Sequence, residues 1–402
     1  MAKQILTILG STGSIGRNTL DVVGRFPDRF RVHALAAHSN VEQMGRQIAA
    51  VQPSLAVLFD AEAAGRLRES LPTDTRTDVL TGMEGLIEAA GAPEVDHVVS
   101  GMVGAVGLRP THAAIEAGKR VSIANKETLV LAGELMVGLA ARTGSVLIPM
   151  DSEHNAIFQC LAGASGKELE RIVLTASGGP FRDLPLAGFG AITREQALAH
   201  PNWKMGPKIT IDSATMMNKG LEVIEARWLF GLEAERIQVL IHRQSIVHSM
   251  VEFVDGSVIA QLGLPDMRTP IAYCLSHPGR LPVQLPRLDL GQVGRLDFKQ
   301  VEEERYPCLS LALRALAMGG CAPAVLNGAN EEVVAGYLND AFHFTEIAVI
   351  LEEVMAHLER TLEQPGAPAC LGAIASVDDA ILADQWGRET AKTIILRSES
   401  CC

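Results

Sequence analysis

The stretch ILTILGSTGSIG, residues 5–16, decides the fold of the first part of the chain. A strand-type apolar run, Ile5–Leu9, leads directly into glycines at every third position, Gly10, Gly13 and Gly16. Glycines permit a sharp turn and a close approach of the backbone to a pyrophosphate, and the amides of the following helix face the anion. The spacing differs from the commoner G-x-G-x-x-G, so a tight turn without a ligand is the alternative. The position directly after a strand favours a dinucleotide site.

Five more short apolar runs follow this turn and alternate with helical patterns. Continuous apolar strands that alternate with helices are typical of a parallel sheet covered on both faces. Residues 1–150 are therefore predicted to form a Rossmann-like, doubly wound α/β domain. The runs are residues 31–36, 56–59, 97–100, 120–124 and 146–150.

A change of pattern after residue 150 predicts a second, catalytic α+β domain over residues 151–286. Residues 249–253 are followed by Asp255-Gly256, which is typical of a hairpin. Prolines crowd the end of this domain, and residues 287–306 are predicted to form a linker. The prolines are Pro278, Pro282 and Pro286, and the further strands are predicted at 209–211, 237–241 and 257–260.

The last part of the chain, residues 307–402, is predicted to form a C-terminal bundle of roughly four helices. One helix is expected from Pro307 to near Gly319, and another from about Pro323 to Tyr337. Hydroxyl side chains that precede helical patterns are typical N-caps, and Thr345 and Ser376 fit that role.

Composition and charge restrict the function classes. Of 402 residues, 48 % are hydrophobic and 20 % are charged, and the formal net charge is −12. An acidic chain without basic runs does not favour a nucleic-acid surface, because such surfaces neutralise phosphates with clustered cations. No apolar stretch has the length of a membrane helix, and the first residues show no signal-peptide pattern. Seven scattered cysteines without a C-x-x-C pair indicate reduced thiols, so a cytoplasmic location is expected.

The residues after the second strand distinguish between the two nicotinamide cofactors. NAD enzymes usually carry an acidic residue there for the ribose hydroxyls. Here the strand leads into His38, Ser39 and Asn40, and no carboxylate is present to repel a 2′-phosphate. Three polar side chains are available as donors instead, so NADP is favoured over NAD.

Two carboxylates, Asp151 and Glu153, directly follow the last predicted strand of the first domain. Side chains two residues apart in an extended backbone point the same way, so both can reach one ion in the crevice at the sheet edge. Oxygen ligands without cysteine favour Mg²⁺ or Mn²⁺ over zinc. The alternative is a helix N-cap, with Asp151 or Ser152 starting the helix that follows.

A second polar cluster lies in residues 212–222 and leads into a long helical pattern. Asn218 and Glu222 are four residues apart, and Lys219 is three before Glu222, so the three share a helix face. With Ser213 they offer a hydroxyl, an amide, an ammonium and a carboxylate, a set that suits a phosphate and a third metal ligand. A solvated helix face with one Lys–Glu pair is the alternative.

Two loops have the composition of binding segments. Residues 175–180 offer free amides and the hydroxyl of Ser177, which can cradle a phosphate. Residues 200–206 place Trp203 and Met205 on a loop between a proline and a glycine, and such a loop can close over a ligand as a lid. An ordinary turn is the alternative for both.

Together these segments resemble one family, the 1-deoxy-D-xylulose 5-phosphate reductoisomerases. The resemblance covers nearly the whole chain, in order, and several motifs of this length are very specific. The matching stretches are GSTGSIG at 10–16, ANKE at 124–127, DSEHNAIFQ at 151–159, SGGPFR at 177–182, HPNWKMG at 200–206, DSATMMNKGLE at 212–222 and RYPCL at 305–309.

The resemblance implies roles for the residues at matching positions. Contacts with NADPH are implied for Gly10, Thr12, Gly13, Ser14, Ile15, His38, Ser39, Asn40, Asn125, Glu127 and Gly206. The implied metal ligands are Asp151, Glu153 and Glu222. The implied substrate contacts are Lys126, Ser152, Glu153, Ser177, His200, Ser213, Asn218, Lys219 and Glu222, among which Lys126, Glu153 and His200 are the candidate catalytic residues. Family members often carry a lysine or arginine where this chain has Ser39, so His38 or Ser39 is expected to take its place beside the 2′-phosphate.

The activity that the resemblance implies is NADPH-dependent conversion of 1-deoxy-D-xylulose 5-phosphate to 2-C-methyl-D-erythritol 4-phosphate, in the non-mevalonate route to isoprenoids. The expected reaction is a metal-assisted rearrangement by retro-aldol cleavage and re-addition, followed by hydride reduction. The resemblance also implies a homodimer. Two alternatives stay open: an NADP-linked dehydrogenase of another small polyol or phosphate without rearrangement, and a non-enzymatic NADPH sensor on a dehydrogenase scaffold.

Overall fold

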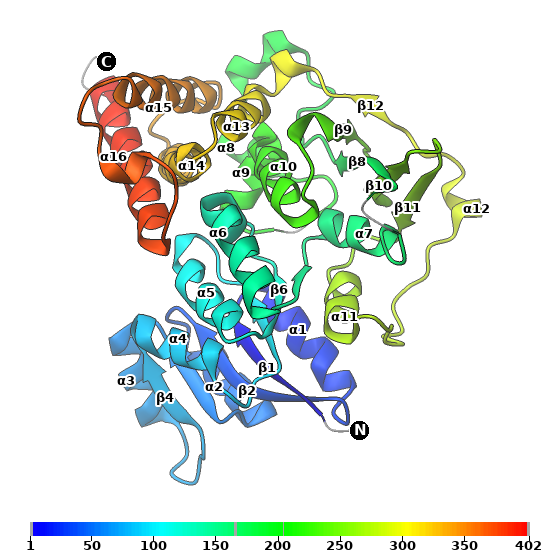
Figure 1. Ribbon diagram of the computed structural model, residues 1–402, viewed down its shortest axis with the longest axis vertical. Coiled ribbons are helices and arrows are strands. Elements are labelled where there is room, and N and C mark those ends of the chain that lie inside the picture. Colours follow the sequence, from blue (N-terminus) through cyan, green and yellow to red (C-terminus); the bar gives the residue numbers. More distant parts are fainter. Residues whose placement is uncertain (1–2, 165–166, 204, 400–402) are drawn as a thin grey trace. The chain divides into compact units, whose positions relative to one another are not determined.

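A seven-stranded parallel sheet forms the centre of the first part of the chain (Figure 1). Its strand order is β4-β3-β2-β1-β5-β6-β7, and all neighbouring strands run parallel. The computed structural model describes residues 3–164, 167–203 and 205–399. The strands are β1 (Gln4–Leu9), β2 (Phe30–Ala37), β3 (Leu55–Leu58), β4 (Asp78–Thr81), β5 (His97–Ser100), β6 (Arg120–Ile123) and β7 (Leu147–Pro149).

The α/β fold class is confirmed, and the structure adds one strand that the sequence did not predict. The missed strand, β4, has only two apolar residues and lies at the sheet edge, where its side chains are exposed or half-buried. In the central strand β1, by contrast, Leu6 and Ile8 are fully buried. Apolar runs identify buried strands such as the other edge strand, β7, and β4 lacks that signal because none of its four residues is buried.

Helices connect the strands of this sheet. The longest of them, α6 (Glu127–Thr143), is interrupted at Ala132, whose φ of −145° and ψ of 36° are not helical. Within α6, Gly133 leaves room for the ring of Trp228, because a Cβ there would lie 2.1 Å from a ring carbon. The other helices are α1 (Ser14–Arg25), α2 (Val41–Val51), α3 (Ala61–Ser70), α4 (Gly82–Gly91) and α5 (Leu108–Glu116).

Contacts between Cα atoms divide the chain into two compact units. Unit 1 comprises Met1–Thr128, Met136–Asn155 and Asp266–Pro286, and unit 2 comprises Leu129–Leu135, Ala156–Pro265 and Arg287–Cys402. Both α6 and α7 (Ser152–Cys160) therefore carry residues of both units.

The segment 266–286 returns to unit 1, whereas the sequence predicts it as the end of the second domain. It contains α11 (Arg268–Ser276), and Nη1 of Arg268 lies 3.3 Å from Oδ2 of Asp21 in α1. Nη1 of Arg120 also donates to the carbonyl of His277 at 2.9 Å. These partners lie more than 150 residues away in the sequence, so no local pattern predicts them. The separate linker and bundle at 287–306 and 307–402 stay predictions.

Unit 2 contains a mixed five-stranded sheet with the order β11-β10-β8-β9-β12. The predicted hairpin is confirmed, because β10 and β11 pair antiparallel, with Met250 opposite Ala260. Strands β8 and β9 run parallel at the centre. The strands are β8 (Leu169–Ala176), β9 (Ile237–Ile241), β10 (Val247–Phe253), β11 (Val258–Leu262) and β12 (Lys299–Gln300).

The predicted strand at 209–211 is wrong, because these residues belong to the helix α9 (Pro207–Thr215). The β-branched residues of the run Ile-Thr-Ile favour a strand only as a weak preference. Gly206 in extended conformation and Pro207 at the first helical position instead start a helix. Met216, with a φ of 61°, ends α9, and α10 (Met217–Phe230) begins directly after it.

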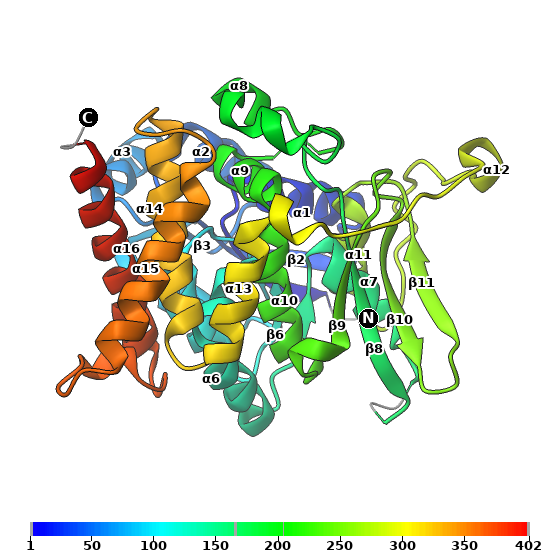
Figure 2. The ribbon, with the colours of Figure 1, turned by 90° about the horizontal axis from the view of Figure 1, so that it is seen from above.

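Helices dominate the end of the chain, as predicted, and Figure 2 shows α14, α15 and α16 side by side. The predicted N-cap at Ser376 is confirmed, since its Oγ accepts from the backbone N–H of Asp379 at 3.1 Å. Thr345 occupies the N-cap position of α15 without a side-chain cap bond. These helices are α13 (Pro307–Met318), α14 (Ala322–Leu338), α15 (Glu346–Leu362) and α16 (Val377–Glu399). Among the described residues, no helix combines the length and the apolar character that a membrane crossing requires.

Candidate active site

The glycine turn after β1 is built for close backbone approach. Gly10 has a φ of 82°, and a Cβ there would lie 2.4 Å from the carbonyl oxygen of Gly101. Gly13 is the N-cap of α1 and supplies no side-chain cap to the helix. Gly13 and Ser14 are exposed, and no acidic side chain stands in the first turn. The first amides of α1 are therefore arranged to receive an anion.

This turn lies at the point where the strand order of the sheet changes direction. β1 is paired with β2 on one side and with β5 on the other, so the chain order reverses between β1 and β5. Doubly wound sheets bind their ligands in the crevice at such a point. Asn125, which follows β6, is 3 % exposed and donates from its amide nitrogen to the carbonyls of Met102 and Gly104. It fixes the loop after β5 beside the glycine turn.

The three polar residues after β2 differ in their contacts. His38, Ser39 and Asn40 are exposed. Oδ1 of Asn40 accepts from the backbone N–H of Gln43 at 3.0 Å and caps α2. The imidazole of His38 lies 5.8 Å from the ring of Phe59, centroid to centroid. The cap uses the acceptor oxygen of Asn40 and not its amide Nδ2, so His38, Ser39 and Asn40 all remain candidate donors to a 2′-phosphate.

A buried ion pair lies at the carboxyl ends of β6 and β7. Nζ of Lys126 lies 2.8 Å from Oδ2 of Asp151, and the two side chains are 9 % and 17 % exposed. Burial by itself would raise the pKa of Asp151. The ammonium of Lys126 and the nearby His154, together with side-chain hydrogen bonds, outweigh that effect and hold the pKa well below its ordinary value. Asp151 is therefore a carboxylate at any physiological pH.

Glu153 is the second carboxylate of this region. An oxygen of Glu153 lies within 4.8 Å of an oxygen of Asp151, and Oγ of Ser152 donates to Oε2 of Glu153. The backbone N–H of Asn155 donates to the carbonyl of Asp151 at 2.8 Å, so these residues also start α7. The metal-ligand and the N-cap interpretations thus describe the same local structure, because a helix start brings the two carboxylates together.

A loop rich in glycine, residues 177–180, follows β8 in unit 2; we name it the phosphate loop. Gly179 has a φ of 65°, and a Cβ there would lie 2.7 Å from the carbonyl oxygen of Ser213. Only glycine permits the loop to pack this closely against the last turn of α9. The structure thereby places the loop that carries Ser177 against the turn that carries Ser213.

His200 completes this arrangement, and its hydrogen bonds define its tautomer. The backbone N–H groups of Asn202 and Trp203 donate to its Nδ1 at 3.2 and 2.9 Å. Burial, followed by the charge of Arg182, lowers the pKa of His200 to about 4, so the ring is neutral at pH 7. A neutral ring that accepts at Nδ1 carries its proton on Nε2, which therefore donates to Oγ of Ser177 at 3.1 Å.

Oγ of Ser177 accepts a second hydrogen bond from the backbone N–H of Gly179 at 3.2 Å. Because both interactions use the oxygen as acceptor, the hydroxyl hydrogen of Ser177 is available to a further acceptor. A phosphate oxygen is such an acceptor. The same contacts tie Trp203 to this group through His200. Lys204, in the same loop, lies outside the described residues.

The first two turns of α10 hold the third cluster. Nζ of Lys219 pairs with Oε2 of Glu222, and the side chains are 4 % and 1 % exposed. Nδ2 of Asn218 donates to Oε1 of Glu222. The cluster is therefore buried, and the alternative of a solvated helix face is wrong. A buried carboxylate with this many donors is held in one orientation.

Three side chains to which the sequence assigned no role bind carbonyls of the phosphate loop or of the residue that follows it. Nη1 of Arg182 donates to the carbonyl of Ser177 at 2.9 Å, and Nη1 of Arg305 donates to the carbonyl of Phe181 at 3.1 Å. Oη of Tyr306 donates to the carbonyl of Gly178 at 2.9 Å. The motifs SGGPFR and RYPCL contain all three residues, but only their contacts reveal the function of the arginines and the tyrosine.

If residues 177–180 bind a phosphate, as the sequence predicts, replacing Tyr306 by phenylalanine should raise the KM for the substrate about 5-fold and change kcat less than about 2-fold, since one buried carbonyl loses its donor. Tyr306 is 1 % exposed, and burial raises the pKa of its hydroxyl to about 12, so the group always donates. Steady-state kinetics measures both constants.

Tyr337→Phe is the matched control. Tyr337 is also buried, and its hydroxyl has no hydrogen-bond partner among the residues that the structure describes. Equal changes of KM in the two variants would show that the hydroxyl of Tyr306 does not position the phosphate loop.

The predicted site residues fall into two groups. Unit 1 carries the cofactor-type residues and the first two carboxylates: Gly10, Thr12, Gly13, Ser14, Ile15, His38, Ser39, Asn40, Asn125, Lys126, Glu127, Asp151, Ser152 and Glu153. Unit 2 carries the phosphate-type residues, the lid residues and the third carboxylate: Ser177, His200, Trp203, Met205, Gly206, Ser213, Asn218, Lys219 and Glu222.

A parallel sheet with an uncapped glycine turn, together with half-buried carboxylates at its edge, defines an α/β protein of the dinucleotide-binding class. Three family models match this chain. The 1-deoxy-D-xylulose 5-phosphate reductoisomerase model matches residues 6–133, the model of that enzyme's C-terminal domain matches 147–230, and the DXP reductoisomerase C-terminal domain matches 262–390. The chain therefore belongs to the 1-deoxy-D-xylulose 5-phosphate reductoisomerase family, which confirms the prediction from its motifs.

Individual relatives agree over the full length. Curated 1-deoxy-D-xylulose 5-phosphate reductoisomerases from Pseudomonas putida (strain W619) and Anaeromyxobacter dehalogenans (strain 2CP-1) are 50 % and 51 % identical to this chain. The first match covers 98 % of this chain and 99 % of the relative, and the second covers 96 % of each.

Solved structures of the family have the same fold. The enzyme from Zymomonas mobilis in complex with NADPH gives a TM-score of 0.90 at 41 % identity, covering 98 % of this chain and 99 % of that one. A DOX-P reductoisomerase in complex with NADPH, fosmidomycin and magnesium gives 0.89 at 40 % identity, covering 98 % of both chains. The chain is thus an enzyme of this family, and neither a dehydrogenase without rearrangement nor a sensor is favoured.

Proposed function

We propose that this chain converts 1-deoxy-D-xylulose 5-phosphate to 2-C-methyl-D-erythritol 4-phosphate with NADPH and a divalent cation, in isoprenoid synthesis. Membership of the family, over nearly the full length, is the observation that carries the proposal. When bound, the cation supplies Lewis-acid stabilisation of negative charge, and NADPH supplies the hydride. The residues of this chain bind, orient and protonate the reactants.

The cofactor site is assigned to unit 1. The exposed first turn of α1 has neither a side-chain cap nor an acidic residue, so its amides fit a pyrophosphate. Thr12 and Ser14 add hydroxyl donors beside these amides. His38, Ser39 and Asn40 are assigned to the 2′-phosphate, because all three are exposed and the cap of α2 uses only the carboxamide oxygen of Asn40.

Asp151, Glu153 and Glu222 are proposed to hold one Mg²⁺ or Mn²⁺. Their donor set consists of carboxylate oxygens alone, which such cations prefer.

The substrate's phosphate is assigned to the phosphate loop and to α9 and α10. The hydroxyl oxygen of Ser177 accepts from His200 and from the N–H of Gly179, so its hydrogen can be donated to a phosphate. Ser213 lies against Gly179 of the same loop. Asn218 and Lys219 add an amide and an ammonium. Binding the distant phosphate tightly positions the reacting carbon atoms, so binding energy away from the reaction contributes to the rate.

Lys126 and Glu153 are the proposed proton-transfer groups, and His200 orients Ser177 rather than titrating at neutral pH. Lys126 is buried and held by Asp151, so its ammonium has a fixed direction. A positioned acid or base of this kind contributes about 100-fold or more to a rate. A homodimer and a cytoplasmic location complete the proposal; sedimentation of the purified chain tests the first.

The deciding experiment follows NADPH oxidation with 1-deoxy-D-xylulose 5-phosphate, with and without EDTA. NADPH should be consumed only when both the substrate and a divalent cation are present, and the product should be 2-C-methyl-D-erythritol 4-phosphate. Asp151→Asn serves as a site variant and should be inactive at the same cation concentration. Full activity in EDTA, or oxidation of NADPH with unphosphorylated sugars at the same rate, would contradict the proposal.

The loop with Trp203 is expected to report ligand binding by fluorescence. The chain has three tryptophans, so Trp228→Phe together with Trp386→Phe leaves Trp203 as the single emitter. Its backbone is bonded to His200, which contacts Ser177, and closure over the phosphate should change its surroundings. We expect a shift of emission on adding NADPH, Mn²⁺ and fosmidomycin. An unchanged spectrum at saturating ligand, measured beside a binding titration, would rule out a lid at this position.

A further inference from the structure

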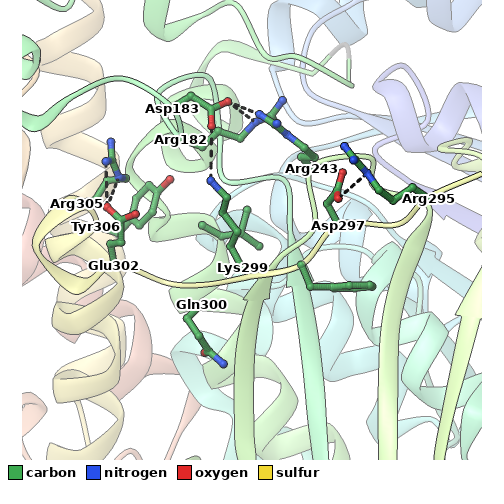
Figure 3. A pocket seen from close by; sticks show the side chains of 12 residues that line it. Arg182, Asp183, Arg243, Arg295, Asp297, Lys299, Gln300, Glu302, Arg305 and Tyr306 are labelled. Carbon is green, nitrogen blue, oxygen red and sulfur yellow. Dashed lines mark hydrogen bonds and ion pairs between the residues drawn. The ribbon is translucent and has the colours of Figure 1, made fainter.

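A cavity of about 220 Å³ lies in unit 2, next to the phosphate loop but lined by other residues (Figure 3). Its walls come from the segment after that loop, from the end of β9 and from residues 295–306. β12 pairs with β9, with Lys299 opposite Ile241, and this fixes the outer wall. The ring of Phe298 stacks on His242 at 4.6 Å between centroids, which holds the same segment in place.

The cavity is rich in positive charge. Five cations line it, Arg182, Arg243, Arg295, Lys299 and Arg305, against three carboxylates, Asp183, Asp297 and Glu302. This local excess of cations occurs in a chain whose net charge is −12, so it does not follow from the overall composition.

Three of the cations share one carboxylate. Figure 3 shows Arg182, Arg243 and Lys299 directed towards Asp183. The separations are 3.7 Å for Nε of Arg182 and 4.0 Å for Nζ of Lys299, and Arg243 makes the shortest contact. One carboxylate cannot balance three cations, and the pKa of Arg182 is lowered by its burial and by the charge of Arg243. An anion with several charges would relieve that repulsion.

The cavity is connected to the phosphate loop through its own lining. Arg182 faces the cavity with Nε and donates to the carbonyl of Ser177 with Nη1. Arg305 and Tyr306 likewise line the cavity and hold the carbonyls of Phe181 and Gly178. A ligand in the cavity therefore fixes the side chains that fix the phosphate loop.

We propose that this cavity is a second anion site, which binds a small diphosphate-type polyanion and tightens the phosphate loop through Arg182. The binding part stands on the cavity alone, and the effect on the substrate rests on the proposed function. A diphosphate suits the site because it carries several negative charges on two groups, and five cations line the cavity against three carboxylates.

The binding test titrates inorganic diphosphate into the full-length protein by calorimetry, in EDTA so that no metal complex forms. Arg243→Gln combined with Lys299→Gln should weaken binding at least about 10-fold, since two charge-assisted contacts are lost. Both side chains are largely exposed, 42 % and 67 %, so the variant should fold. Lys392→Gln, an exposed cation elsewhere in unit 2, is the matched control and should bind as the wild type does.

Other outcomes of the titration would overturn the proposal. If Ser213→Ala weakens diphosphate binding and the double variant does not, the anion occupies the substrate's phosphate site. If the double variant instead changes the sedimentation coefficient, the cavity is part of an interface between copies of the chain. Equal binding by the wild type and the double variant would show that the cavity takes no diphosphate.

The coupling test measures the KM for 1-deoxy-D-xylulose 5-phosphate with and without diphosphate at a fixed free Mg²⁺ concentration. The KM should fall about 3-fold or more in the wild type and stay constant in the double variant, with kcat unchanged in both. Chelation of the cation acts on both proteins alike, so an equal change in both would overturn the coupling. Binding of diphosphate by an otherwise inactive chain would contradict the proposed function and leave the anion site standing.

Discussion

Glu222→Gln is expected to lower kcat/KM at least about 100-fold at a limiting divalent cation concentration, because loss of a ligand costs more than the 10- to 100-fold typical of residues that only support ligands. The substitution keeps the size of the side chain and removes its charge. The affinity for the cation, measured by titrating activity with Mn²⁺, should fall accordingly. Part of the loss should be recovered at high Mn²⁺.

The same substitution also affects stability. Glu222 and Lys219 form a buried pair with 1 % and 4 % exposed side chains. Removing one charge breaks this buried ion pair, which costs about 3 kcal/mol or more. The thermal midpoint should therefore be lower for Glu222→Gln than for the wild type, even without metal. Glu222→Asp, which keeps the charge, should recover much of the midpoint and part of the activity.

Two controls separate metal binding from folding. Glu233→Gln removes an equally charged side chain that is 69 % exposed and lies just beyond the end of α10. It should leave kcat/KM and the affinity for the cation unchanged. Thermal unfolding identifies any variant that is not folded at the assay temperature. A folded Glu222→Gln variant with wild-type activity at low Mn²⁺ would remove Glu222 from the ligand set.

Gly16→Ala is expected to lower the thermal midpoint by several degrees and to weaken NADPH binding at least about 10-fold, since overpacking costs about 1–3 kcal/mol and here meets backbone. A Cβ on Gly16 would lie 2.3 Å from Cα of Ser11 and 2.4 Å from the carbonyl oxygen of Gly10. Neither atom can move without displacing the turn. Quenching or energy transfer on titration with NADPH measures the affinity.

Gly24→Ala is the matched control in the same helix. A Cβ on Gly24 would meet no atom within 4 Å. Alanine is favoured over glycine in helices by up to about 1 kcal/mol, so this variant should be as stable as the wild type or more stable. If both variants bind NADPH equally well, the turn at Gly16 does not form the pyrophosphate site.

The sequence predicted the sheet well because its strands are covered on both faces. Continuous apolar runs identified β1, β2, β3, β5, β6 and β7, and they missed only the edge strand β4. It failed at 209–211, where β-branched residues resemble a strand but Gly206 and Pro207 start a helix. The prediction followed the strand preference of the β-branched residues, whereas the glycine and the proline before them determine the structure.

In the candidate site, the sequence likewise predicted which residues share a helix face, but not which elements pack on that face. Spacing of three and four residues placed Asn218, Lys219 and Glu222 on one helix face, and the structure confirms their hydrogen bonds. The spacing could not show that this helix face is buried, because burial depends on the elements that pack over the face. The sequence therefore left the solvated alternative open.

The amino-acid sequence by itself determined the class of sheet, the glycine turn and the family. These depend on residues close together in the chain or on long motifs. Only the tertiary structure showed that residues 266–286 return to unit 1, that His200 donates through Nε2, and that Tyr306 reaches Gly178 across 128 positions of sequence. Such contacts depend on how whole elements pack against one another. A local sequence pattern does not contain the identity of the element that packs against it.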